Sequence, residues 1–266
     1  MSRTAELPPR LPRLSPLSFA MSIGAIALVL VSIGQVAPSV GQMAEGVPNL
    51  VNLVSRMVPP NTDPAFLQRI FWRILETFQI ALAGATIGIV ISLPIAWISA
   101  RGVGPFGSIG AGLTKAFVSF LRTVPDLVWA LLFVATVGLG AVAGTMTIVV
   151  DTVGFCGRFF AEAMEDSEKE PQEAISAIGG NRLSILFGAI IPDVMPSLIN
   201  SSLFALEKAV RSSVVLGLVG AGGIGQELKV AFDMFQYKNA STIILVIFVI
   251  VLGMEWVTDK LRRKLQ

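Results

Sequence analysis

Three charged side chains interrupt an apolar stretch of about 25 residues that ends at Leu216. They are Glu207, Lys208 and Arg211. Charged groups inside a long apolar segment usually pair with one another or face a polar cavity, because burying an isolated charge is costly. Glu207 and Arg211 are four residues apart, which places them on one helix face as a candidate ion pair and turns Lys208 elsewhere. Ser212 and Ser213 follow directly, so hydroxyl groups stand beside two cations and the segment could bind an anion. A structural ion pair plus a lysine that reaches the aqueous boundary explains the same residues equally well.

Other chemistry finds little support in the sequence. The chain has no histidine, and Cys156 is its one cysteine, so an internal disulfide is excluded and the usual ligands of zinc, haem or iron–sulfur centres are missing. No Gly-x-x-x-x-Gly-Lys-Ser/Thr motif for ATP phosphates occurs. We therefore expect no cofactor, metal or catalytic residue on this chain.

A run of glycines, Gly220-x-Gly222-x-x-Gly225, matches the dinucleotide-binding pattern by letter. No β-α-β unit surrounds it and no acid follows at the required distance, which argues against a nucleotide site. We interpret the glycines as residues that let the backbone turn in a crowded loop. A less favoured alternative is a nest of backbone amides that binds an anion.

The composition is that of a protein embedded in lipid. Hydrophobic residues make up 53% of the chain and charged residues only 14%, compared with about 25% charged residues in soluble domains. Several uncharged runs approach or exceed the roughly 20 residues that a helix needs to cross a bilayer. They are Leu14–Ala44, Thr77–Ala100, Leu127–Val150 and Asn239–Met254. We predict an all-α integral membrane protein with six transmembrane helices.

The predicted spans divide the chain into two parts: residues 1–70, with a first span and an external loop, and a core of residues 71–266. The second span carries the small-residue spacing Gly84-x-x-x-Gly88, which allows helices to approach closely. The expected spans are about Leu17–Ala37, Leu75–Ser99, a third that follows an interfacial elbow at 108–121, a fourth from Thr145, Pro192–Leu216 and Ser241–Val257. The loop 38–69 could hold a helix that lies on the membrane.

Basic residues predict the orientation of these spans. Three arginines precede the first span and four basic residues follow the last, which by the positive-inside rule places both termini in the cytoplasm. A cleaved signal peptide is the disfavoured alternative, because the first apolar run is too long for one.

In this orientation, Arg122 and Asp126 are expected at the inner end of the third span. Counting about 1.5 Å per residue from Asp193, Glu207 to Arg211 are expected roughly 20 to 27 Å further out, near the outer mouth. The basic residues that predict this orientation are Arg3, Arg10 and Arg13 before the first span and Lys260, Arg262, Arg263 and Lys264 after the last.

The most polar interior stretch lies between the fourth and fifth spans, at 162–173. It leads into a short predicted helix near 171–182, which Pro171 begins and Gly179-Gly180-Asn181 ends. A helix this short is unstable alone and needs a partner surface. Because the loop is cytoplasmic in the predicted topology, the partner should be cytoplasmic too.

This stretch resembles the EAA loop of ABC importer permeases, whose pattern is Glu-Ala-Ala, three residues, Gly, nine residues and Ile-x-Leu-Pro. Glu173, Ala174, Gly179 and Pro192 occupy matching positions, whereas Ile175, Ala189 and Ile191 are apolar departures. In that family the loop is a coupling helix that docks on the ATPase subunit. The resemblance therefore implies a type I (MetI-like) permease fold, in the bacterial cytoplasmic membrane.

Longer stretches resemble the phosphonate-type permeases. They are the segment 122–130, the segment 152–163 with Asp151 where histidine is expected, and the segment 210–225 with Ser213 where alanine is usual. The resemblance implies a second permease subunit, identical or paralogous, two ATPase subunits that bind ATP and Mg²⁺, and an extracytoplasmic phosphonate- or phosphate-binding protein. The cargo would be a phosphonate, phosphate or phosphite, drawn in by Lys208 or Arg211. Alternatives are a permease for another solute such as methionine, a passive channel, or a membrane enzyme.

Overall fold

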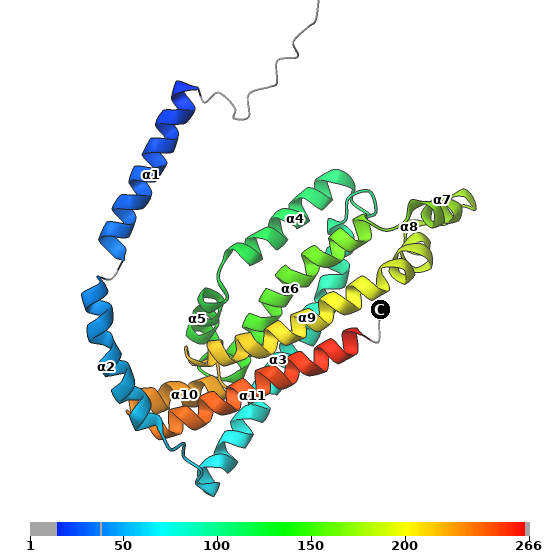
Figure 1. Ribbon diagram of the computed structural model, residues 1–266. Helices are drawn as coiled ribbons and strands as arrows, with labels where there is room; N and C mark the ends of the chain where they lie inside the picture. The colour runs from blue at the N-terminus through cyan, green and yellow to red at the C-terminus, as the bar shows by residue number, and fades with distance from the viewer. Residues whose placement is uncertain (1–14, 38, 264–266) are drawn as a thin grey trace, which may run out of the picture. The chain divides into compact units, whose positions relative to one another are not determined.

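The computed structural model describes residues 15–37 and 39–263, and Figure 1 shows their arrangement. The arginines at 3, 10 and 13 and the lysine at 264 lie outside the described residues. Two compact units are distinguished, residues 1–55 and residues 56–266. Every element of the described chain is helical, as the uncharged runs predict. The helices are α1 (Pro16–Val36), α2 (Val40–Met57), α3 (Pro64–Ser99), α4 (Gly107–Thr123), α5 (Asp126–Val137), α6 (Ala141–Glu165), α7 (Lys169–Ala177), α8 (Arg182–Ile185), the π-helical turn η1 (Leu186–Ile190), α9 (Ile191–Gly217), α10 (Ile224–Asp233) and α11 (Tyr237–Arg262).

The first unit holds α1 and most of α2. Ser15 caps α1 by accepting a hydrogen bond from the Ser18 amide, and Pro16 occupies its first turn. The 21 residues of α1 include no buried side chain. Its length of about 31 Å fits one bilayer crossing. The segment 38–69 holds the helix α2 at 40–57, as the sequence allowed, and α3 begins at Pro64, earlier than the expected start of the second span.

The second unit is built around the pair α3 and α6. A Cβ atom on Gly84 would lie 2.7 Å from Ile148 Cβ, and one on Gly88 would lie 2.5 Å from Thr152 Cβ, so only glycine allows the two helices this approach. The predicted packing role of Gly84-x-x-x-Gly88 is therefore confirmed. The α9 helix packs on both members of the pair, and α10 and α11 pack on α9. Cys156 and Phe160 of α6 lie in the resulting core with at most 1% of their surface exposed.

Within residues 15–37 and 39–263, five helices are long and apolar enough to cross a membrane: α1, α3, α6, the continuous run 182–217 and α11. A sixth crossing exists only if α4 and α5 form one span, and these two helices meet at an angle of 86°. The 12 residues of α5 extend about 18 Å, too little to cross about 30 Å of hydrocarbon. The expected elbow is present, but the helix that follows it cannot cross alone, so a third crossing requires α4 and α5 together.

The break lies level with the middle of α6. A Cβ atom on Gly154 would lie 2.9 Å from Arg122 Cγ and 3.4 Å from Leu121 Cβ, and Gly154 is near the centre of α6. The prediction that Arg122 and Asp126 lie at the inner end of a span is therefore wrong. Asp126 does begin a helix, as expected. The amphipathic pattern of 108–121 suggested a helix on the membrane surface, whereas α4 packs along α6.

The glycine loop that follows α9 is a packing element. Ala221, Gly222, Gly223 and Ile224 are all buried. Gly223 has φ of +72°, and a Cβ atom there would lie 2.6 Å from Thr77 Oγ1. The Ile224 amide donates a 2.8 Å hydrogen bond to that same hydroxyl. The structure thus supports the crowded turn rather than the anion-binding nest, since the Ile224 amide is used inside the fold.

Candidate coupling helix and translocation site

The short helix α7 has the end that its sequence predicts. The Gly180 amide donates to the Ile175 carbonyl at 2.9 Å, and the Gly179 amide donates to the Ser176 carbonyl at 3.0 Å. Together with the positive φ of Gly179, +82°, these two bonds form a Schellman motif. The helix begins at Lys169, two residues before the predicted Pro171, because proline is tolerated anywhere in the first turn.

Contacts on both sides fasten α7 to the bundle. The amide of Glu168 donates to Asp193 Oδ2 at 3.0 Å, which ties the start of α7 to the first turn of α9. Arg182 Nη1 donates to the Gly104 carbonyl at 2.6 Å and ties the other end to the loop between α3 and α4. Sequence reasoning missed Asp193 and Arg182 in this role, because their partners are 25 and 78 residues away.

The outward surface of α7 is open. Ile175 turns inward, and its Cδ1 lies 3.0 Å from the position that a Cβ atom on Gly188 of η1 would take. Glu173 and Ala174 are exposed, and Ile178 exposes 86% of its surface. Pro192 stands in the first turn of α9, directly after the π-helical turn. A short, tethered helix with an exposed isoleucine can serve as a docking element.

Deeper in the bundle, Glu207 forms the expected pair with Arg211 at 2.7 Å. It also accepts from Arg262 Nη2 at 3.2 Å and from Thr258 Oγ1 at 3.4 Å, both on α11. Glu207 therefore links two helices, and Arg262 is not only a topology signal. The contact between Arg262 and Glu207 could not be predicted, because nothing in the sequence sets how far α11 reaches along α9.

Lys208 contacts a different helix. Its Nζ donates to Asp151 Oδ1 of α6 at 2.7 Å and lies 5.7 Å from the centroid of the Phe155 ring. Asp151 exposes 15% of its side chain and Lys208 exposes 34%. Sequence reasoning noted Asp151 only as an unusual residue. The signal was available, because a lone acid that ends an apolar run requires a cation.

Two of these charged residues, Lys208 and Arg211, border a cavity of about 550 Å³ between α5 and α9. Its α5 wall is the first turn after the break, Pro125 to Leu127, and its α9 wall includes Lys208, Arg211 and Ser212. Of the five predicted pathway residues, these three are brought together. Glu207 does not line the cavity, and Ser213 is 2% exposed and donates to the Thr77 carbonyl at 3.3 Å.

The pair of Lys208 and Asp151 lies partway along two neighbouring helices. Asp151 is 10 residues from the start of α6, and Lys208 is 9 residues from the end of α9, so the pair lies about 14 to 15 Å along each helix from that end. The position near the outer mouth stays a prediction. It was counted from Asp193 at the start of α9, where Asp193 accepts a hydrogen bond from the Glu168 amide just before α7.

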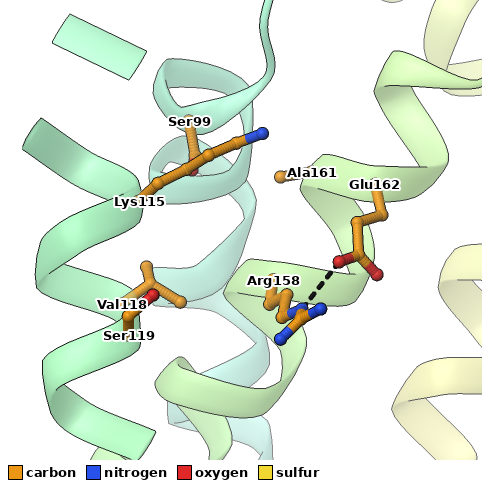
Figure 2. A pocket seen from close by; sticks show the side chains of 7 residues that line it. All are labelled: Ser99, Lys115, Val118, Ser119, Arg158, Ala161 and Glu162. Atoms are coloured by element: carbon orange, nitrogen blue, oxygen red, sulfur yellow. Dashed lines mark hydrogen bonds and ion pairs between the residues drawn. The ribbon is translucent and has the colours of Figure 1, made fainter. Parts of the chain in front are cut away.

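A second pocket, of about 230 Å³, lies between the C-terminal ends of α3 and α6 and the middle of α4 (Figure 2). Its basic groups already have acidic partners. Arg158 contacts Glu162 at 2.6 Å, and Lys115 contacts Glu165 at 2.7 Å. The acidic stretch 162–173 thus begins inside α6, where Glu162 pairs with Arg158 of the same helix and Glu165 pairs with Lys115 of α4. The second of these pairs links α4 to α6.

Comparisons with known proteins agree with this architecture. The phosphate-import permease protein PhnE of Mycolicibacterium smegmatis is 36% identical over 215 residues, which is 81% of this chain and 40% of that protein. The phosphite transport system permease protein PtxC of Stutzerimonas stutzeri is 33% identical over 217 residues, covering 82% of this chain and 78% of that protein. The present chain thus spans less than half the length of the first relative and most of the second.

The fold is also that of a solved transporter structure. The chain of the MetNI methionine ABC transporter in its inward-facing conformation superposes with a TM-score of 0.65 at 22% identity, over 77% of this chain and 100% of that one. The model of one family matches residues 92–266, from the second half of α3 to the end of the chain. With most of the core inside that match, this chain belongs to the family of binding-protein-dependent transport system inner membrane components.

Proposed function

We propose that this chain is the permease subunit of an ABC importer that moves a phosphonate or a related phosphorus oxyanion, such as phosphate or phosphite, into the cell. The names of the two relatives above support this class of cargo. The observation that carries the proposal is the cavity beside the break between α4 and α5, where Lys208, Arg211 and Ser212 converge. Broken helices beside polar groups at mid-depth are where transporters commonly bind their cargo.

The motor in this proposal is a separate ATPase subunit that binds ATP and Mg²⁺ and docks on α7. The exposed Ile178 and the tethers to α9 and to the loop before α4 support this role. A second permease subunit would complete the pathway, and an extracytoplasmic binding protein would deliver the cargo. This chain would then perform no covalent chemistry, and both of its termini would lie in the cytoplasm.

The test is uptake by a reconstituted complex of the permease, the ATPase and the binding protein encoded beside it. Proteoliposomes are offered labelled phosphate, phosphite, methylphosphonate and methionine, with and without ATP. We expect ATP-dependent uptake of at least one phosphorus compound and none of methionine. Uptake without ATP would favour the channel, and uptake of methionine alone would favour the other permease class.

A matched pair of variants tests the cavity. Arg211→Gln removes a cation from the cavity lining, whereas Arg158→Gln removes a cation whose pocket lies elsewhere. We expect the first variant to reduce uptake at least roughly tenfold with the complex still assembled, the usual size of a lost charged contact. Unchanged uptake by Arg211→Gln would contradict the role of the cavity.

A further inference from the structure

Lys208, one of the cations that line the cavity, already has a counter-ion on a neighbouring helix. Lys208 lines the cavity between α5 and α9, but its Nζ donates to Asp151, which stands on α6 and is not part of the cavity lining. The distance of 2.7 Å is that of a strong, charge-assisted hydrogen bond. Phe155, one turn further along α6, flanks the same ammonium group. Lys208 is thus held between α6 and the cavity.

The other cations around the cavity also have acidic partners. Arg211 is paired with Glu207, and Glu207 is also contacted by Arg262. Asp126 lines the cavity from α5. The cations Lys208, Arg211 and Arg262 therefore face the carboxylates of Asp126, Asp151, Glu207 and Asp259, the last of which contacts Arg262 at 3.6 Å, so this group carries no excess of positive charge. An oxyanion that enters finds no free positive charge.

We propose that Asp151 is a built-in counter-ion that competes with the oxyanion for Lys208. In the empty cavity the ammonium group binds Asp151, and the arriving oxyanion draws it away. The competition weakens binding of the cargo and returns the ammonium group to Asp151 when the cargo leaves. A transport site requires such a balance, because a site that binds its cargo too tightly does not release it. This inference rests on the proposed function and adds a residue that sets affinity and turnover.

Three substitutions separate this role from a purely structural ion pair. Asp151→Asn keeps the size of the side chain and an oxygen that accepts from Lys208, but it removes the competing charge. Lys208→Met removes the cation and leaves Asp151 unpaired, which destabilises a partly buried site. The double variant Asp151→Asn with Lys208→Met has neither charge and should assemble normally. Asp233→Asn, in the exposed Lys229–Asp233 pair on α10, is the matched control.

The experiment measures ATP-driven uptake by the reconstituted complex of the phosphorus compound that the unmodified complex transports best. For Asp151→Asn we expect KM to fall roughly tenfold and the maximal rate to fall as well, because the cargo is held longer. For the double variant we expect normal assembly with the ATPase but uptake reduced at least tenfold. The control should keep both parameters.

Two results would overturn the proposal. An unchanged KM in Asp151→Asn would mean that the carboxylate does not compete with the cargo. Wild-type uptake by the double variant would mean that the ion pair only holds α6 and α9 together. Failure of the proposed function looks different, because the unmodified complex would then transport none of the phosphorus compounds.

Discussion

At the residue scale, neighbouring side chains on one helix have different roles because successive residues on a helix point about 100° apart. On α9, Lys208 and Ser212 line the cavity, whereas Ser213 is buried against α3. The same geometry makes Gly84 and Gly88 of α3 face α6, four residues apart on one stripe. At Gly84 and Gly88, a single added Cβ atom would prevent the close approach of α3 and α6.

We predict that Gly88→Ala destabilises the protein by about 1–3 kcal/mol, because its Cβ atom would lie 2.5 Å from Thr152 Cβ and force the helices apart. Gly112→Ala on α4 is the control, since a Cβ atom there meets nothing within 4 Å. Thermal unfolding of the purified protein in detergent measures both. Equal midpoints for the two variants would refute the close-packing argument.

At the element scale, α7 is a nine-residue helix whose stability comes from its ends and its tethers. The Schellman motif at Gly179 closes it, and hydrogen bonds to Asp193 and from Arg182 hold the region against the bundle. A push on α7 would therefore be transmitted directly to α9, the helix that carries Lys208 and Arg211.

We predict that Ile178→Glu weakens association with the ATPase subunit by about 2 kcal/mol, roughly 30-fold, as expected for a central apolar contact. The unfolding midpoint of the isolated permease should not change, because 86% of the Ile178 surface is exposed. Quantitative co-purification measures the effect. Met234→Glu, at the exposed residue that directly follows α10, is the control, and equal losses from both variants would count against a docking role for α7.

At the scale of the whole molecule, the second unit has two distinct ends. Figure 1 shows α7 and α8 at one end of the bundle and α10 at the other. The proposed orientation places the first end in the cytoplasm, where the ATPase is, and the second end outside, where a binding protein would dock. The bent pair α4–α5 lies beside the cavity, which residues 125–127 help to line.

This orientation predicts the labelling of introduced cysteines by a maleimide that cannot cross membranes. Met234→Cys should react in intact cells, whereas Ile178→Cys should react only after the membrane is opened, since both positions are exposed but at opposite ends. The native Cys156 is 0% exposed, so the unmodified protein serves as the unlabelled control. The opposite pattern would invert the topology.

The sequence alone determined the features that depend on local pattern. Apolar runs predicted the membrane helices, the glycines at 179 and 180 predicted the end of α7, and the spacing of Glu207 and Arg211 predicted their pair. Each of these follows from the periodicity of one helix or from backbone freedom at one position. The resemblance of the loop around Glu173 supplied the family, which the comparisons confirm.

Only the tertiary structure decided which helices lie at the same depth. It placed Asp151 against Lys208, Arg262 against Glu207, and the break before Asp126 beside the cavity. These partners are 57, 55 and more than 80 residues apart in the chain, so no local pattern relates them. Their meeting depends on the close approach of α3 and α6 at Gly84 and Gly88 and on the sharp bend between α4 and α5, which together set the relative shift of the helices.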